Sequence, residues 1–522
     1  MIARPAMPRI LLLCALSLAL AAGLAGACTP VRHLLTTADP LAMGPQARPP
    51  LFEDLPAAGP ARRAAWDQER AVLLDQLEAH VYGRPPPAPD TGGLSPWRTI
   101  AASQARGRRA VSRVEITPAG GAALDLQLAL VTPETGAPAR GLVLVPSECG
   151  LQAALHDPAM PAPDGYTPGY CDADGWLAAL VGPVFGEWIS GPPVARLLDR
   201  GYAVAAWHES DIAPDSAALH DDSLRELGLD PDAPDRPGAI ALWAWTLSAV
   251  IDALRAEPRF AEVPVIAYGH SRRGKAVLLA AARDARIAIT LAHQSGTGGA
   301  ALHGDGVGES VAAITESYPH WFAPRYADYA GREDALPVDQ HALLALIAPR
   351  AVLLGGAWRD TWSDPAGAFR AAEAASEAWT IYDAPGLVQA RLADFQPGGG
   401  IAHHIRPGLH GVTDADWDAF LDFMDAHTAP PEAPSRRGGG AAGAARHETG
   451  RRRRSHRSAQ GPGTAPRRTR RGTTARRRRR HGAGWDPGGP CRRPADAGRS
   501  RVRPRPRRAR AQPLAGRPVR RG

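Results

Sequence analysis

The sequence predicts an α/β fold, in which a mainly parallel sheet is covered by helices on both faces as a three-layer sandwich. The first observation is that strand-like and helix-like segments alternate from about residue 141 to residue 427. A βαβα order of this kind implies parallel strands joined by crossover helices. The second is that strands such as "GLVLVP" (141–146) are unbroken apolar runs, which is typical of strands buried on both faces.

The elements before this region predict one helix and one hairpin. In residues 61–81, apolar side chains recur at helical spacing. "RAVSRVEITPAG" (109–120) and "AALDLQLALVTPE" (122–134) predict two strands paired around a Gly-Gly turn.

The alternating region predicts five further strands and six helices, each read from apolar periodicity. The strands are "YAVAAWH" (202–208), "VPVIAYG" (263–269), "ARIAITLAHQSG" (285–296) and "AVLLGGA" (351–357), in addition to 141–146. The helices are 193–201, 239–258, 271–284, 341–350, 366–379 and 417–427.

Charge is divided unevenly along the chain. Residues 431–522 contain 29 Arg and four acidic residues, a net charge of +25, which leaves the remainder, with 32 basic and 49 acidic residues, at −17. We therefore expect an acidic globular domain at 61–428 that does not bind nucleic acid. We expect 429–522 to be a disordered Arg-rich tail, because it cannot bury a core. An out-of-frame reading of GC-rich DNA is an alternative origin for that tail.

The N-terminus resembles an export signal. Arg4 and Arg9 precede the apolar run "ILLLCALSLALAAGLAG", and "AGAC" (25–28) fits a cleavage site or a weak lipobox that would put lipid on Cys28. We therefore expect residues 1–28 to be a signal, 29–60 a Pro/Ala-rich linker, and the protein to be exported. The destination would be the periplasm, the outer membrane as a lipoprotein, or the medium; a single membrane anchor is the alternative.

Cysteine and histidine spacing predicts no zinc site. In an exported protein Cys149 and Cys171 could form a disulfide, although two free buried thiols are an equally good interpretation.

The stretch "YGHSRRGK" (268–275) has the context of a nucleophile elbow, because a strand runs into Gly-His-Ser and a helix follows. The sharp turn would expose the Ser271 hydroxyl, and the backbone N–H of Arg272 at the helix start could stabilise an oxyanion. Arg273 stands where G-x-S-x-G has its second glycine. A helix N-cap is the structural alternative for Ser271.

A serine nucleophile needs an acid and a histidine later in the chain, in that order. Asp360 and Asp364 follow the strand at 351–357, and His410 lies in a Gly-rich loop before the last helix. We favour Asp360, because it is nearer the strand end, and expect Asp364 to cap the next helix. His403 and His404 are rival bases whose alternative role is loop packing.

Beyond these patterns, "GHSRRGK" resembles the G-[CH]-S-R-x-G-K signature of the glucuronoyl esterase family, the 4-O-methyl-glucuronoyl methylesterases and their bacterial relatives. Further segments agree in order: "RPGAIALWAWTLSAVIDAL", "QSGTGGAAL", "YPHWF" with "LPVDQHALLALIAPR", "WRDTWSDP" and "HIRPGLHGVTDADW". The resemblance covers roughly residues 63–427. It implies an α/β-hydrolase fold and cleavage of glucuronate esters such as those that join xylan to lignin, without metal or cofactor.

The resemblance also implies residue roles. Ser271 would be the nucleophile, His410 the general base and Arg272 part of the oxyanion site. Lys275, the only lysine of the chain, would bind the sugar hydroxyls, and Trp362 would pack on the sugar. Glu309 would be a further polar substrate contact.

One position departs from the fungal members, which carry the acid just before S-G-x-G-G. Gln294 stands there and cannot be an anion. Bacterial relatives often place the acid after the later strand, where Asp360 lies.

The sequence therefore predicts a monomeric serine esterase of glucuronic acid esters. The alternatives are an acetyl or feruloyl xylan esterase, another α/β-hydrolase such as a peptidase, and a non-catalytic surface protein whose Arg-rich tail binds polyanions.

Overall fold

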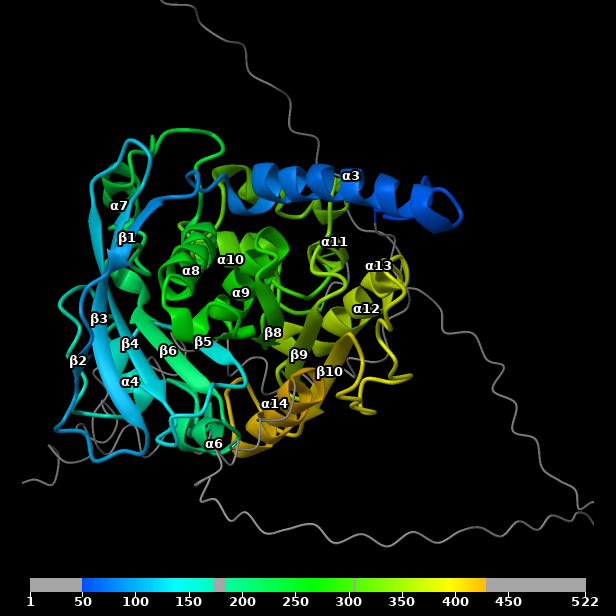
Figure 1. Cartoon of the computed structure of the whole chain (residues 1–522). Helices are drawn as coiled ribbons and strands as arrows, with labels where there is room; N and C mark the ends of the chain where they lie inside the picture. Colours follow the sequence, from blue (N-terminus) through cyan, green and yellow to red (C-terminus); the bar gives the residue numbers. More distant parts are fainter. Residues whose placement is uncertain (1–48, 172–184, 304–306, 429–522) are drawn as a thin grey trace, which may run out of the picture. The chain divides into compact units, whose positions relative to one another are not determined.

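A ten-stranded mixed sheet runs through the described part of the chain, which in this computed structural model comprises residues 49–171, 185–303 and 307–428 (Figure 1). The strand order is β1-β3-β4-β6-β5-β7-β8-β9-β10, with β2 paired to β3. Along this order, all pairings between β6 and β10 are parallel. The pairings among β1, β2, β3 and β4, and the pairing of β4 with β6, are antiparallel. The predicted mainly parallel sheet is confirmed.

The strands have the following bounds: β1 Asp90–Leu94, β2 Arg98–Thr99, β3 Arg108–Thr117, β4 Leu124–Thr132, β5 Leu142–Ser147, β6 Ala203–His208, β7 Val265–His270, β8 Ile287–His293, β9 Ala351–Ala357 and β10 Ile401–Arg406.

The α-helices of the described residues are α3 Gly59–Leu77, α4 Gly150–Leu155, α6 Val194–Asp199, α7 His220–Glu226, α8 Ala239–Arg255, α9 Arg272–Arg283, α10 Val311–Ser317, α11 Gln340–Ala345, α12 Pro365–Ala375, α13 Glu377–Thr380 and α14 Asp414–His427. A π-helical turn, Glu78–Tyr82, extends α3, and a 3₁₀ turn, η6, spans Thr361–Ser363. Within the described ranges, no helix combines the length and apolarity needed to cross a bilayer.

Two apolar cores lie on opposite faces of the sheet, because successive strand side chains point to opposite faces. In β5, Leu142 and Leu144 belong to the core that α8, α9, α11 and α12 cover, whereas Val143 and Val145 belong to the core that α4, α6 and α14 cover (Figure 1). The same alternation holds along β6 and β7. The three-layer architecture predicted from the sequence is therefore confirmed.

The predicted strands and helices are observed, with the helix at 366–379 divided into α12 and α13, but β1, β2, α4, α7 and α10 were not predicted from the sequence. One strand of the parallel region was also missed. Residues 401–406, which we expected to be loop around His403 and His404, form the edge strand β10, which pairs in parallel with β9. The loop prediction was wrong because two adjacent histidines look polar, yet the first is fully buried in the sheet.

Several sequence predictions lie outside the described residues. They are the signal at 1–28 with its lipid site Cys28, the linker up to residue 48, and the Arg-rich segment 429–522. Of the predicted linker, residues 49–58 are described, and α3 begins at Gly59, two residues before the expected start of the domain.

The two body cysteines form a disulfide: Cys149 is bonded to Cys171, with their Cα atoms 5.3 Å apart. This decides the alternative that the sequence left open. The bond ties Cys171, in the segment that follows α4, back to Cys149, which lies between β5 and the start of α4.

Strand order places a ligand site at the carboxyl edge of the sheet. The chain runs from β5 outward to β6, then returns through α8 to β7 on the other side of β5. Crevices at such a reversal, outside the carboxyl ends of the strands, are where open α/β sheets bind ligands.

Candidate active site

Ser271 lies on a sharp turn at the carboxyl end of β7, directly before α9. Its backbone is in an unusual region, with φ +56° and ψ −123°, which is the strained geometry of a nucleophile elbow. The Ser271 N–H donates to the carbonyl of His293 at 2.8 Å. Gly269 makes the turn sterically accessible, because a Cβ there would lie 2.3 Å from the Arg273 carbonyl oxygen.

His410 and Asp360 form a hydrogen-bonded pair. His410 Nδ1 lies 2.9 Å from Asp360 Oδ2, and because a carboxylate only accepts, the ring nitrogen is the donor. Burial would raise the pKa of Asp360, but His410 and the hydrogen bonds from Ser363 outweigh it and hold that pKa below its usual value. Asp360 is therefore a buried anion that orients the His410 ring through Nδ1, as a triad in which Nε2 is the base would require.

In the described part of the chain, no hydrogen bond joins the Ser271 hydroxyl to His410. Catalytic hydrogen bonds are often long in free enzymes and tighten only when substrate binds.

Asp364, the rival acid, has a different position. It caps α12, accepting the N–H of Gly367 at 2.8 Å, and takes a left-handed backbone with φ +42°. Burial raises its pKa to about 6. The structure thus places Asp360, and not Asp364, against His410.

The rival bases lie within β10. His403 is fully buried and packs edge-on against Phe369, with ring centroids 6.1 Å apart. His404 packs against Phe395 in the same manner, at 5.6 Å. Both rings therefore belong to the packing around the edge strand.

The Arg272 side chain is held over a platform beside the nucleophile. Its guanidinium pairs with Asp215 and lies 4.5 Å above the Trp321 ring. Asp215 also accepts from Trp321 Nε1 at 2.7 Å and from His320 Nε2 at 2.9 Å. A buried carboxylate with three donors fixes the direction of the arginine.

Arg273 explains why the second glycine of G-x-S-x-G is absent. Its guanidinium forms ion pairs with Glu148 at 2.8 Å and Glu209 at 2.7 Å, which follow β5 and β6. Burial, opposed by Arg273, raises the pKa of Glu209. The side chain at this position ties three strand ends together.

Lys275 is buried at one helical turn beyond Ser271, with 4% of its surface exposed. Its Nζ donates to the carbonyls of Ser295 and Thr297, each at 2.6 Å. Burial lowers the pKa of Lys275, and Glu309 partly offsets this. Two of the three ammonium protons therefore go to backbone, and a contact with a sugar hydroxyl stays a prediction for the third.

Glu309 and Trp362 lie next to this lysine site. The Thr297 hydroxyl donates to the Glu309 carbonyl, and the Glu309 N–H donates to the Trp362 carbonyl at 3.1 Å. Burial raises the pKa of Glu309, and its Oε1 has no hydrogen-bond partner in the described residues. A continuous set of contacts thus runs from Lys275 through Thr297 to both predicted substrate residues.

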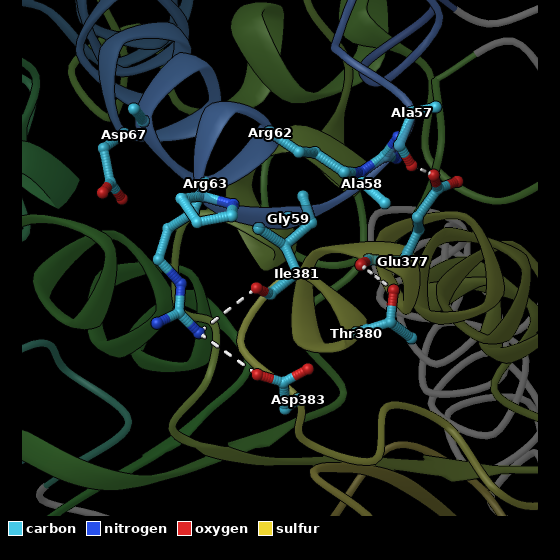
Figure 2. Close-up of a pocket in the computed structure, with 12 residues that line it drawn as sticks. Ala57, Ala58, Gly59, Arg62, Arg63, Asp67, Glu377, Thr380, Ile381 and Asp383 are labelled. Atoms are coloured by element: carbon cyan, nitrogen blue, oxygen red, sulfur yellow. Dashed lines mark hydrogen bonds and ion pairs between the residues drawn. The ribbon is translucent and has the colours of Figure 1, made fainter.

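A pocket in another part of the described residues has a volume of about 660 Å³ and lies between the start of α3 and α13 (Figure 2). Its charged side chains are already paired, Arg62 with Glu377 and Arg63 with Asp383. None of the predicted site residues lines it.

Among the residues that the structure describes, no three His, Cys, Asp or Glu side chains are grouped as a metal site would require.

Sequence reasoning missed the residues that hold the site in place. Glu148 and Glu209 each directly follow a buried strand, so a search for polar residues at strand ends would have found them. Asp215 and Ser363, whose hydroxyl lies 3.2 Å from His410 Nδ1, carry no local sequence signal.

Comparison with known proteins agrees with this geometry. The sequence profile described as "Glucuronyl esterase, fungi" matches residues 197–383. A carbohydrate esterase from an unknown prokaryotic organism is 38% identical over 251 residues, which are 47% of this chain and 57% of the relative. A 4-O-methyl-glucuronoyl methylesterase of Schizophyllum commune is 32% identical over 276 residues, 50% of this chain and 66% of the relative.

These alignments cover only part of the curated relatives; for the prokaryotic esterase and a Wolfiporia cocos methylesterase, the chain spans 57% and 54% of their length.

Solved structures are matched over nearly their whole length. A glucuronoyl esterase from Solibacter usitatus is 29% identical with a TM-score of 0.62, and the match covers 74% of this chain and 99% of that one. A promiscuous CE15 esterase from a marine bacterial metagenome has the same coverage and TM-score at 26% identity. Together with the sheet order, the elbow serine and the Asp–His pair, these similarities support a glucuronoyl esterase of bacterial type with the α/β-hydrolase fold.

Proposed function

We propose that this protein is a serine esterase that hydrolyses esters of glucuronic acid, such as those between xylan glucuronate and lignin alcohols. The observation that carries the proposal is the strained Ser271 elbow on the same sheet edge as the 2.9 Å Asp360–His410 pair. The neighbouring Lys275, Glu309 and Trp362 supply a polar and aromatic site of the kind that a hydroxyl-rich sugar needs.

The reaction is a two-step acyl transfer. His410 Nε2 takes the proton of Ser271 as its Oγ attacks the C6 carbonyl carbon of the uronate. The oxyanion is stabilised by the Arg272 N–H, at the positive end of α9, and by the nearby guanidinium. The alcohol leaves with the proton from His410. Water, deprotonated by His410, then attacks the acyl-enzyme and releases glucuronate and free Ser271.

An ester substrate suits the charge of the domain. The part of the chain before residue 431 has a net charge of −17, which would repel a polyanion. A uronate ester has no carboxylate charge before it is cleaved, so the repulsion is smaller at the start of the reaction.

The proposal extends to the organisation of the chain. The catalytic domain spans residues 61–428 and acts as a monomer without metal or cofactor. Residues 1–28 direct export, by cleavage or by lipid attachment at Cys28, and 29–60 are a linker. The protein would act in the periplasm, on the outer membrane or in the medium. The intact mass of the native protein tests signal removal, lipidation and the segment 429–522 together.

The decisive assay is hydrolysis of benzyl glucuronate by the wild type and by Ser271→Ala. We expect the variant to lose at least about 10³-fold in kcat, because the nucleophile is gone. The matched control is Ser223→Ala, a buried serine in α7 whose hydroxyl only donates to the Leu219 carbonyl. The control should keep wild-type kcat.

Two outcomes would contradict the proposal. Activity that survives in Ser271→Ala would remove Ser271 from its role. A wild type that cleaves 4-nitrophenyl acetate but not benzyl glucuronate would indicate another esterase, for example an acetyl or feruloyl xylan esterase.

A further inference from the structure

Gln294, directly after β8, makes hydrogen bonds on both sides of His410. Its amide Nε2 donates to the Leu409 carbonyl at 3.2 Å, and its Oε1 accepts the Gly411 N–H at 2.8 Å. The two partners fix which amide atom is oxygen and which is nitrogen, since a carbonyl only accepts and an N–H only donates. The side chain therefore holds the backbone immediately before and immediately after the proposed base.

The same amide also reaches the nucleophile strand. Gln294 Oε1 accepts from His270 Nε2 at 3.0 Å, and His270 is the residue before Ser271. The His270 ring packs against the His410 ring with centroids 4.7 Å apart. Burial, with the nearby His410 and His293 rings, holds the pKa of His270 well below its ordinary value, so a neutral ring lies beside the base.

The Gln294 backbone is tied to the acid side of the site. Its N–H donates to the Gly355 carbonyl in β9 at 2.8 Å, and its carbonyl accepts from the Ser363 hydroxyl at 3.3 Å. That hydroxyl lies 3.2 Å from His410 Nδ1, and the Ser363 N–H donates to Asp360 at 3.4 Å. Gln294 itself has a left-handed backbone, φ +50°, and is only 3% exposed.

Other side chains also hold this loop. His293 Nε2 lies 3.0 Å from the Gly411 carbonyl. Arg406, paired with Asp416, donates to the Gly411 carbonyl at 2.6 Å and to the Leu409 carbonyl at 3.3 Å. Neither accepts the Gly411 N–H, and although the His293 ring packs against His270 with centroids 5.5 Å apart, neither forms a hydrogen bond with the His270 ring. Among the described residues, Gln294 is thus the side chain that hydrogen-bonds both the His410 loop and the His270 ring.

We propose that Gln294 is a positioning residue, which fixes the His410 ring relative to both Ser271 and Asp360. The expected effect of Gln294 on catalysis rests on the proposed function, whereas its effect on the position of the His410 ring does not. Without the amide, the Leu409 carbonyl keeps only the longer Arg406 contact at 3.3 Å and the Gly411 N–H loses its acceptor. The loop would then sample other conformations, and a displacement of about 1 Å at a reacting group can cost about 100-fold in rate.

The test compares Gln294→Leu with a matched control, Gln389→Leu. Gln389 is similarly buried, at 5% exposure, and likewise bonds only backbone groups. It accepts the His403 N–H at 2.7 Å and donates to the carbonyls of His403 at 3.0 Å, Arg391 at 3.3 Å and Leu392 at 3.5 Å. It bonds β10 rather than the His410 loop. Both variants therefore lose a buried amide of the same kind, but only one loses contact with the base.

We expect Gln294→Leu to lower kcat on benzyl glucuronate about 10- to 100-fold with KM within about twofold. The low-field proton resonance of His410 Nδ1–H, seen with ¹⁵N-histidine labelling, should broaden or move. Labelling of Ser271 by a fluorophosphonate should slow by a similar factor as kcat. Gln389→Leu should lose a comparable amount of thermal stability. Its kcat and its labelling rate should stay within twofold of the wild type, and its His410 resonance should not shift.

The inference is overturned if Gln294→Leu keeps the wild-type kcat and resonance. It is also overturned if both variants lose activity in proportion to lost stability. If Gln294→Leu fails to fold, Gln294→Glu is measured in its place. A glutamate keeps the hydrogen-bond acceptor and loses the donor. The rate at which the fluorophosphonate labels this variant should therefore lie between the rates of the wild type and of His410→Ala. Because resonance and labelling need no sugar ester, failure of the proposed function leaves this test intact.

Discussion

At the scale of single residues, the environment of Lys275 determines what can replace it. The ammonium lies between two backbone carbonyls, and a Cβ on Gly296 would be only 3.7 Å from its Nζ. A planar guanidinium is wider and cannot point two donors at the same two oxygens in that space. The lysine therefore supports the Ser295–Thr297 segment as well as any substrate contact.

Lys275→Arg is expected to reduce kcat/KM for benzyl glucuronate about 10- to 100-fold, because hydrogen bonds of a charged group are worth about 1.5–3 kcal/mol. The fold should persist, as measured by circular dichroism and urea unfolding. Arg283→Lys, at the far end of α9, is the control and should keep wild-type kcat/KM. Unchanged kinetics in Lys275→Arg would show that the lysine is not required.

Residue-scale prediction from the sequence reached the candidates but not their contacts. Asp360 and Asp364 follow the same strand four residues apart, and only the 3₁₀ turn between them determines which carboxylate meets His410. Gln294 hydrogen-bonds the backbone groups of Leu409 and Gly411. Backbone groups are the same at every residue, so these contacts cannot be predicted from the types of side chain in the sequence.

At the scale of elements, the turn from β7 into α9 leaves no room for a side chain at Gly269. The nearest contacts of an added Cβ would be backbone atoms of Arg273, at 2.3 and 2.4 Å, which cannot swing aside. The elbow can relieve such a clash only by moving Ser271 or unwinding the first turn of α9.

Gly269→Ala is accordingly expected to destabilise the protein by about 1–3 kcal/mol or more and to abolish esterase activity. Urea unfolding and the benzyl glucuronate assay measure the two effects. Gly398→Ala, where a Cβ would meet nothing within 4 Å, should change neither quantity. An active and stable Gly269→Ala variant would show that the turn can take another backbone conformation that accommodates the added Cβ.

Element-scale prediction worked where apolar periodicity is uninterrupted. The strands at 141–146 and 351–357 and the helix from residue 239 were readable because almost every core-facing position is aliphatic. β10 was not predicted, because its buried positions include His403. A histidine suits an apolar core only when it is neutral, and here burial lowers the pKa of His403 and keeps it so.

At the scale of the whole molecule, buried histidines couple stability to pH. Burial lowers the pKa of His403 to about 3 and that of His293 to about 4, against 6.5 in an exposed ring. Below pH 6.5 these two histidines therefore bind protons in the unfolded chain but stay neutral in the folded protein. Their contribution to the free energy of unfolding is full above pH 6.5 and is lost as the pH falls toward the pKa of the folded state. Buried carboxyls such as Glu309, with a raised pKa, act in the opposite sense.

The contribution of His403 can be measured by comparing the free energies of unfolding of a variant and the wild type. Neither nitrogen of His403 has a hydrogen-bond partner in the described residues, so His403→Leu should be neutral or stabilising at pH 7. Between pH 6 and pH 4 the variant should gain on the wild type by roughly 1 kcal/mol for each pH unit, measured as free energy of urea unfolding. A gap that stays constant with pH would mean that His403 titrates normally in the fold.

The burial of Lys275 has a practical consequence for anyone who handles this protein. It is the only lysine in the sequence, and in the folded state 96% of its surface is covered. Amine-directed crosslinkers, dyes and coupling resins therefore find no accessible side-chain target on the folded domain, and only the terminal amino group remains. Modification of Lys275 by such a reagent would instead report how often the region around the nucleophile opens to solvent.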